Sequence, residues 1–434
     1  MKTYLYPNQN DWESILKRPT QTVDDIESTV LEVFNDVMEK GDSAVNAYTK
    51  KFDKVELVKL LVTEEEIQNA TSQVDTSLKE AIQLAKRNIG AFHSAQQTER
   101  VAVNTMEGVE CWQEKRPIQK VGLYIPGGTA PLFSTVLMLA IPAKIAGCND
   151  IVLCSPPNSE GQIANEILYT AQLCGVTKIF KVGGIQAIAG MTFGTASVPK
   201  VYKIFGPGNQ YVTVAKQLAT KYGVAIDMPA GPSELLVMAD DTANPEFVAS
   251  DLLSQAEHGK DSQVILVSTS KVLVEKVNKS IQRQLNELPR KGIAEVAISN
   301  SKSIVVKDFE TALDLIDEYA PEHFIVATKD DDFFVKNINN AGSVFLGNFT
   351  PESAGDYASG TNHTLPTNGF AKAYSGVNLA SFQKSVTFQK ISEKGIKNIG
   401  PSIELMAEAE GLQAHKNAVT LRLMSFLRRQ ESLS

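Results

Sequence analysis

The chain has 434 residues, of which 43% are hydrophobic and 21% are charged, as in ordinary globular proteins. At roughly 150 residues per domain, this length suffices for about three domains with sizeable cores. The net charge of −8 argues against nucleic acid or an anionic membrane as the main partner. The apolar stretch 136–141 is too short to span a membrane, and the first residues lack the apolar segment of a signal peptide. We therefore expect a cytoplasmic protein.

Residues 1–23 are polar and predict a small N-terminal arm. Thr63 and Glu66 have the spacing of a capping box, in which each side chain bonds the backbone N–H of the other residue. A long helix is expected to follow, ending near Gly90 or a few residues later.

Residues 121–233 alternate short apolar runs with helical patterns. The expected buried strands are 121–125, 151–154, 178–182 and 201–205. One intervening helix is expected over about 162–173. Strands that alternate with helices of about 10–15 residues are typical of parallel βαβ units. We therefore expect residues 121–233 to form one doubly wound α/β domain.

A second α/β set follows this domain. Its expected strands are 235–239, 264–268, 324–327 and 343–346. We expect residues 24–120 to pack with residues 234–378, which makes the second domain discontinuous. Residues 379–434 are expected to form a C-terminal tail with an amphipathic helix over 417–428.

Four glycine-rich turns close strands of the first α/β domain, namely Pro126-Gly127-Gly128, Gly183-Gly184, Gly206-Pro207-Gly208-Asn209 and Gly231-Pro232-Ser233. Open α/β sheets bind ligands at the carboxyl ends of their strands, where helix N-termini offer N–H groups to phosphates. No Gly-x-Gly-x-x-Gly motif is present, because Tyr211 stands where the third glycine would be. The turns therefore fit either a dinucleotide site or tight connections alone. Tyr124, Gln186 and Asn209 lie at three of these edges and are candidate nucleotide contacts.

Gln255 and His258 lie three residues apart on a predicted helix, so their side chains share one face. An oxygen and a nitrogen ligand suit an ion such as Zn²⁺ or Mn²⁺. The same pair is also compatible with a polar helix face that binds nothing. His415, just before the last predicted helix, can cap that helix or bind a metal.

Glu322 and His323 lie just before a predicted strand and can supply two proton-transfer groups. Alternatively, they mark a helix–strand junction with a solvated Glu322. Residues 347–369 form a long polar loop, which we interpret as an ordered lid. Within it, Asp356 is a candidate metal ligand and His363 a candidate substrate contact.

The four cysteines form no Cys-x-x-Cys pair and have apolar neighbours; they are Cys111, Cys148, Cys154 and Cys174. Such cysteines are usually small core residues in a reducing compartment. A catalytic thiol is the alternative interpretation.

From about residue 25 to the end, the chain resembles the histidinol dehydrogenase family in several long motifs that occur in the family's order. Two of them are Ser254-Gln-Ala-Glu-His-Gly259 and Gly360-Thr-Asn-His-Thr-Leu-Pro-Thr367. The others span residues 121–135, 204–209, 226–234, 319–323 and 414–418. The resemblance implies two doubly wound, incomplete Rossmann-like domains, with a small arm and a tail domain, similar to aldehyde dehydrogenases.

The resemblance also implies a reaction and a set of site residues. The reaction is oxidation of L-histidinol to L-histidine through L-histidinaldehyde with two NAD⁺, the last step of histidine biosynthesis. One Zn²⁺ per site is implied to bind Gln255, His258, Asp356 and His415. The last ligand is implied to come from the partner chain of a domain-swapped homodimer.

By the same resemblance, NAD⁺ contacts Tyr124, Gln186 and Asn209. The substrate contacts are the four zinc ligands with His323, Ser233, His363 and Glu410. Glu322 and His323 are the implied acid–base pair, in which His323 takes the hydroxyl proton and Glu322 activates water in the second step.

Three other functions are weighed against this one. The first is a related zinc dehydrogenase for another small polar alcohol, such as a sulfonated diol. Glu410 argues against it, because a carboxylate suits a cationic amino group. The second is a nucleotide-binding protein without turnover, and the third is an aldehyde dehydrogenase that uses a thiol.

Overall fold

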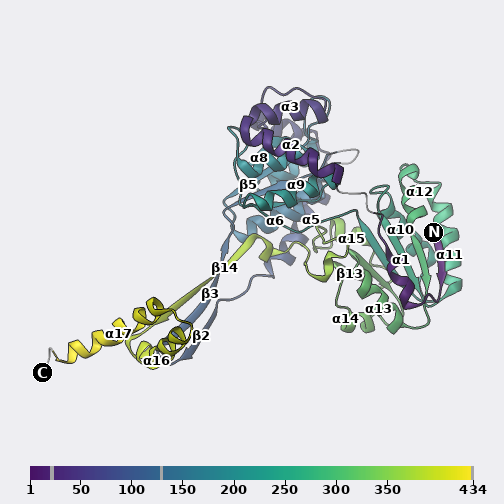
Figure 1. The fold of residues 1–434 in the computed structure, drawn as a ribbon. Coiled ribbons are helices and arrows are strands. Elements are labelled where there is room, and N and C mark those ends of the chain that lie inside the picture. The colour runs from purple at the N-terminus through teal and green to yellow at the C-terminus, as the bar shows by residue number, and fades with distance from the viewer. Residues whose placement is uncertain (20–23, 128–130, 432–434) are drawn as a thin grey trace. The chain divides into compact units, whose positions relative to one another are not determined.

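The computed structural model describes residues 1–19, 24–127 and 131–431 (Figure 1). The chain divides into two compact units. The first comprises residues 1–96 and 118–382, and the second comprises residues 97–117 and 383–434. Among the described residues, none of the helices is both long and apolar enough to cross a bilayer.

The first unit contains two parallel sheets, of which one lies in the 121–233 region. Its strands, in spatial order, are β6 (Lys178–Lys181), β5 (Asp150–Ser155), β4 (Lys120–Tyr124), β7 (Lys203–Phe205) and β8 (Ala225–Ile226). The direction of strand order reverses between β4 and β7, as in doubly wound folds. The predicted α/β class is thus confirmed, and the four predicted strands of this region are present.

Helices cover this sheet with two apolar cores. One core contains residues of α4 (Glu64–Gln73), α5 (Thr76–Ser94), α6 (Phe133–Ala146) and α7 (Asn165–Leu173). The other contains residues of α2 (Asp24–Lys40), α3 (Asp42–Phe52), α8 (Gly184–Phe193) and α9 (Gln210–Lys221). The expectation that this N-terminal material packs with the second α/β set is therefore wrong. Helix α6 is buried around nearly its whole circumference, and the Ile82 and Ile89 face of α5 covers it.

The capping box is present, because Thr63 accepts from the Glu66 N–H while the Glu66 carboxylate accepts from the Thr63 N–H. The single long helix expected after it is wrong. Helix α4 ends at Gln73, and α5 starts anew at Thr76 because Asp75 caps it through the Ser77 N–H.

The second sheet of the first unit is also parallel. Its order is β1 (Lys2–Leu5), β11 (Lys302–Val305), β10 (Gln263–Ser268), β9 (Glu234–Ala239), β12 (His323–Ala327) and β13 (Ser343–Leu346). Its helices are α1 (Trp12–Leu16), α10 (Pro245–Ala256), α11 (Lys271–Leu285), α12 (Lys291–Asn300), α13 (Phe309–Tyr319), α14 (Asp332–Asn337) and α15 (Glu352–Tyr357). Four of these strands match the prediction; β11 and β1 were missed.

The N-terminal segment is not a separate arm over residues 1–19. Strand β1 pairs with β11, and Trp12, Ile15 and Leu16 of α1 are buried in the core of the second sheet. Burial of these three apolar side chains joins the segment to the sheet. The rest of the predicted arm, residues 20–23, lies outside the described residues.

The second unit has an antiparallel sheet and a helix pair. The sheet order is β14 (Gln383–Ile391), β3 (Val109–Pro117) and β2 (Val101–Met106). Helix α16 (Glu393–Ala409) packs against α17 (Gln413–Glu431), which contains the predicted 417–428 helix. Several apolar side chains of this unit are exposed in the single chain, including Leu405, Met406 and Leu421.

Candidate active site

A cavity of about 490 Å³ in the first unit gathers most of the site residues expected from the sequence. Its lining includes Ser233, Gln255, His258, Glu322, His323, Asp356 and His363. Gln255 lies in the last turn of α10, and His323 is the first residue of β12. The cavity therefore lies at the amino ends of the second sheet's strands, and Asp356 of α15 also lines it.

The two ring nitrogens of His323 have different surroundings. Nδ1 lies 3.1 Å from the carbonyl oxygen of Glu234, which can only accept a hydrogen bond. Nδ1 therefore carries a proton and donates it to this oxygen. Nε2 is buried and has no hydrogen-bond partner among the described residues, with Asp356 Oδ1 at 3.6 Å. This nitrogen is thus the one available to accept a proton from a bound molecule.

Carboxylates surround the buried His323 imidazole. Glu322 Oε2 lies 3.6 Å and Glu352 Oε1 3.7 Å from Nδ1. Burial alone would lower the pKa of His323, but Glu352, Glu322 and Asp356 raise it well above its usual value. The site therefore stabilises the imidazolium that forms when His323 accepts a proton.

Glu352 belongs to the site although the sequence did not single it out. It lies in the polar 347–369 segment that was expected to be a loop, at the start of α15. Its side chain is buried, and Oε1 has no hydrogen-bond partner among the described residues. Burial raises the pKa of Glu352, and the nearby Asp356 carboxylate raises it further.

The two amide atoms of Gln255 have different surroundings. Its Nε2 donates to the Glu234 carbonyl oxygen at 3.2 Å, which fixes the amide. Its Oε1 is buried and without a hydrogen-bond partner among the described residues. One ligand atom each of His323, Glu352 and Asp356 lies within 4.8 Å of the others, so oxygen and nitrogen donors cluster here. The donor set in this cavity therefore fits a borderline cation such as Zn²⁺.

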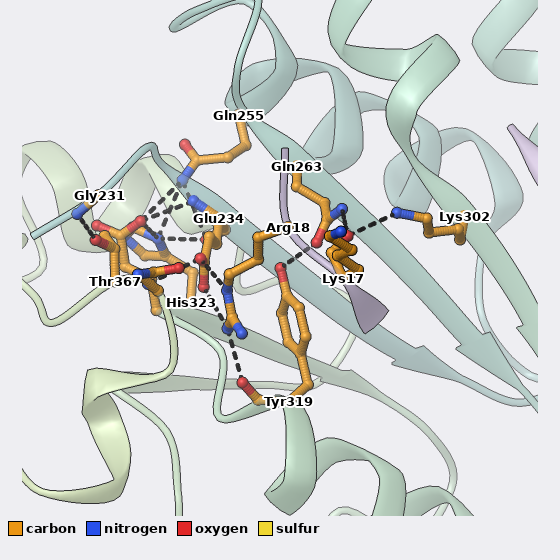
Figure 2. A network of polar contacts seen from close by, with 12 residues as sticks. Lys17, Arg18, Gly231, Glu234, Gln255, Gln263, Lys302, Tyr319, His323 and Thr367 are labelled. Carbon is orange, nitrogen blue, oxygen red and sulfur yellow. Dashed lines mark hydrogen bonds and ion pairs between the residues drawn. The ribbon is translucent and has the colours of Figure 1, made fainter. Parts of the chain in front are cut away.

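Glu234 connects this cluster to the N-terminal segment (Figure 2). Its carboxylate accepts two hydrogen bonds from Arg18, at 2.5 and 2.9 Å. Arg18 also donates to the Tyr319 carbonyl oxygen at 2.7 Å and stacks over the Tyr319 ring. The backbone N–H of Glu234 donates to Glu322 Oε2 at 2.8 Å, and its carbonyl oxygen accepts from His323. Arg18 thus holds the residue that orients both members of the expected acid–base pair.

His363 and its neighbour are anchored by buried contacts. His363 Nε2 lies 3.1 Å from the Thr135 hydroxyl, and Nδ1 lies 2.9 Å from the Asp356 carbonyl oxygen. Burial lowers the pKa of His363. Asn362 contacts the buried His93, whose helical context gave no functional signal in the sequence.

The expected nucleotide contacts line a second cavity of about 850 Å³. Tyr124 ends β4, and its hydroxyl accepts from the Gly184 N–H at 3.1 Å. Gln186 lies in the first turn of α8, and Asn209 caps α9 by accepting from the Val212 N–H. All three follow the carboxyl ends of strands of the first sheet, and Tyr124 and Asn209 lie after β4 and β7, between which the strand order reverses.

The glycine-rich turns allow close approach of backbone segments at this edge. Gly206 has φ +129°, and a Cβ there would lie 2.0 Å from the Tyr124 carbonyl oxygen. A Cβ on Gly127 or Gly183 would meet Pro156. The turns are therefore tight connections by necessity; Gly128 lies outside the described residues.

Residues 16–423 match the sequence model of the histidinol dehydrogenase family. The chain belongs to this family. A histidinol dehydrogenase from Bacteroides fragilis is 61% identical, over 98% of this chain and 99% of that protein. One from Haemophilus influenzae is 53% identical, over 98% and 99% respectively. The crystal structure of histidinol dehydrogenase from Elizabethkingia anophelis has a TM-score of 0.96 and 56% identity, covering 98% of each chain.

Members of the histidinol dehydrogenase family are NAD-dependent oxidoreductases, so the enzyme class expected from the sequence is confirmed. The cysteines agree with a chemistry that needs no thiolate. Burial raises the pKa of Cys148 to about 11 and of Cys154 and Cys174 to about 12. Cys111 lies in β3 of the second unit.

Two residues implied by the family resemblance lie in the second unit. Glu410 is the C-cap of α16, and His415 lies in the first turn of α17. Both side chains are exposed in the single chain. The first unit thus gathers the other implied zinc ligands and substrate contacts by itself.

Proposed function

We propose that the chain oxidises L-histidinol to L-histidine through L-histidinaldehyde in the cavity around His323. The observation that carries the proposal is the buried, unpartnered Nε2 of His323 beside Gln255 and Asp356. NAD⁺ accepts one hydride in each of the two oxidations. The carboxylates around His323 and the family membership support this assignment.

Zinc is proposed to bind Gln255, His258, Asp356 and His415 of the partner subunit. When bound, it would orient the amino and imidazole nitrogens of histidinol. The clustered carboxylates support a cation here, because buried carboxylates without a counter-charge are costly. The orphaned Gln255 Oε1 supplies a ligand atom that no described residue uses.

In the first oxidation, His323 Nε2 takes the hydroxyl proton as the hydride leaves the carbinol carbon. In the second, Glu322 takes a proton from the water that adds to the aldehyde carbon, and the resulting hydrate gives up the second hydride. Glu322 Oε2 is fixed by the Glu234 N–H, which leaves its other oxygen for this task. Ser233, His363 and Glu410 are the proposed additional substrate contacts.

A domain-swapped homodimer in the cytoplasm is proposed to be the working form. The exposed Leu405, Met406 and Leu421 give the second unit an apolar surface that a partner chain can cover. In this arrangement, Glu410 and His415 would serve the partner's cavity.

The two proton-transfer roles can be separated by substrate. His323→Asn should slow L-histidinol oxidation by about 10²–10⁴-fold, the usual contribution of a general base, while Glu322→Gln should mainly slow oxidation of added L-histidinaldehyde. NADH absorbance measures both reactions, and zinc content shows whether each variant retains metal. Equal, small effects of both substitutions on both reactions would contradict the assignment.

Metal dependence has its own measurement. Chelation should abolish NADH formation, and added Zn²⁺ should restore it, with one zinc per chain by elemental analysis. Gln255→Ala should lower the zinc content of the purified protein, whereas the isosteric Gln255→Glu should retain zinc. Full activity of a metal-free protein would contradict the proposed zinc role.

A further inference from the structure

The two cavities of the first unit adjoin each other. Pro126 and Asn209 line both, so the cavity around His323 lies next to the 850 Å³ cavity at the carboxyl edge of the first sheet. A dinucleotide that presents its nicotinamide to a substrate at His323 can therefore extend its adenosine half into the second cavity. Ile185, in the first turn of α8, lines that cavity and offers its N–H group to the pyrophosphate, whereas the Gly184 N–H is already donated to the Tyr124 hydroxyl.

Asp53 is the one charged side chain among the described residues that line the second cavity. Neither lysine nor arginine occurs among those lining residues, so they provide no positive partner for an additional phosphate. A lone carboxylate in a nucleotide cavity typically binds ribose hydroxyls, whereas a nearby arginine accommodates a 2′-phosphate. The charge of the lining therefore favours an unphosphorylated ribose.

The backbone holds Asp53 at this place. Asp53 ends α3, and its N–H donates to the Thr49 carbonyl oxygen at 2.8 Å. Lys54 follows with φ +61°, a conformation that turns the chain sharply after the helix. Asp53 is thus fixed by the end of α3 and by the packing of α3 against α8.

The Asp53 carboxylate is only partly satisfied. Oδ2 accepts from Gln186 Nε2 at 3.2 Å, while Oδ1 makes no hydrogen bond with any described residue. Burial raises the pKa of Asp53 to about 6. Gln186 is fully buried, and its own Oε1 lacks a partner among the described residues. This pair therefore offers free acceptors to a ligand that brings hydroxyl donors.

Two exposed aromatic side chains line the same cavity. Phe52 is 42% exposed and Tyr211 is 45% exposed. Exposed aromatic faces in a nucleotide cavity are suited to stacking against a base. Phe52 precedes Asp53 directly, so a base and its ribose can be contacted by neighbouring residues.

We propose that Asp53 binds the ribose hydroxyls of the adenosine half of NAD⁺ and thereby selects NAD⁺ over NADP⁺. The proposal rests on the placement of NAD⁺ given above. A 2′-phosphate would bring its charge against the carboxylate, and it would remove one of the two hydroxyl donors.

The test is Asp53→Asn, which keeps the shape and removes the charge. Steady-state kinetics with L-histidinol would give kcat/KM for NAD⁺ and for NADP⁺. We expect a loss of about tenfold or more with NAD⁺, the effect of a hydrogen bond to a charged group, mainly through KM. The loss of kcat/KM with NADP⁺ should be smaller or absent. The ratio of kcat/KM for NAD⁺ to kcat/KM for NADP⁺ should therefore fall by about tenfold.

Glu56→Gln is the matched control. Glu56 lies three residues on, is exposed and pairs with Lys50, so its substitution removes the same charge from the same segment. This variant should keep the wild-type ratio of kcat/KM values. An unchanged ratio in Asp53→Asn, or an equal change in Glu56→Gln, would overturn the proposal. Thermal melting of both variants checks that each is folded.

A third variant separates the failure of this proposal from failure of the NAD⁺ placement. Ala164 lines the second cavity, and Ala164→Trp would obstruct it. If NAD⁺ binds there, this variant should raise KM for NAD⁺ and weaken competitive inhibition by ADP-ribose. A raised KM in Ala164→Trp with an unchanged ratio in Asp53→Asn would refute the role of Asp53 alone. An unchanged KM in a folded Ala164→Trp would refute the placement and with it the proposal.

Discussion

Removal of the Arg18 side chain should both destabilise the protein and impair catalysis. The Arg18 side chain is 16% exposed and the Glu234 side chain only 2% exposed, so this ion pair is largely shielded from water. Breaking a buried pair by removing one partner costs about 3–5 kcal/mol, because the remaining charge stays buried. Arg18→Met should therefore lower the free energy of unfolding by about this amount, measured by urea unfolding.

The catalytic effect follows from the position of Glu234. Its backbone groups bond both Glu322 and His323, so a shift of this residue misplaces both. Misplacement on the order of 1 Å can cost about 100-fold in rate, so kcat for L-histidinol should fall by about tenfold to 100-fold. The rate of NADH formation, followed by absorbance at saturating NAD⁺ and L-histidinol, gives this kcat.

Lys17→Ala is the matched control, because the adjacent Lys17 side chain is exposed and only its carbonyl oxygen accepts hydrogen bonds. It should change stability by less than about 0.5 kcal/mol. Adding Glu234→Gln to Arg18→Met removes the uncompensated charge and should recover part of the lost stability. The charge argument is refuted if Arg18→Met lowers the free energy of unfolding no more than Lys17→Ala does. It is also refuted if the double variant recovers none of the stability lost in Arg18→Met.

Three further outcomes are expected. Gly206→Ala should lower the thermal midpoint and raise KM for NAD⁺, because its Cβ would collide with the Tyr124 carbonyl oxygen at a φ of +129°. Replacing all four cysteines by serine or alanine should preserve kcat. Alkylation of the native protein near neutral pH should be slow at the three buried thiols, because their raised pKa values leave almost no thiolate. The preference for NAD⁺ over NADP⁺ should grow from about pH 5 to about pH 7, because Asp53, with its pKa of about 6, becomes charged over this range while the facing Tyr124, with its pKa of about 12, stays neutral. An Asp53→Asn variant should show no such change in preference.

Local sequence patterns predicted the elements whose residues, taken alone, form a recognisable apolar run or capping motif. Apolar runs such as 151–154 and 264–268 are buried strands because both faces of each sheet are covered. The Thr63 capping box is a contact within one turn and is present as predicted. By contrast, β1 has only four residues, of which Lys2 and Thr3 are polar, and its pairing with β11 joins positions about 300 residues apart. No local pattern indicates such a pairing.

The candidate site was predictable only in part, because many of its contacts join residues that are distant in sequence. The sequence assigned Gln255, His258 and Asp356 to a metal site only through the family resemblance, because the spacing of Gln255 and His258 alone favoured a polar helix face that binds nothing. Arg18 and Glu352 were missed. Each acts through a partner distant in sequence, and a charged residue in a polar segment looks the same whether it is solvated or buried against a histidine.

The topology explains why these distant residues meet. In a parallel sheet, the helix that follows a strand returns the chain to the amino edge, so its last turn lies beside the first residues of neighbouring strands. Helix α10 follows β9 and brings Gln255 to the start of β12, where His323 lies. The nucleotide site proposed for the first sheet lies instead at its carboxyl edge, where Tyr124 and Asn209 are. Because the second sheet's amino edge and the first sheet's carboxyl edge line adjoining cavities, a proton acceptor on one and a nucleotide on the other can act on the same substrate carbon.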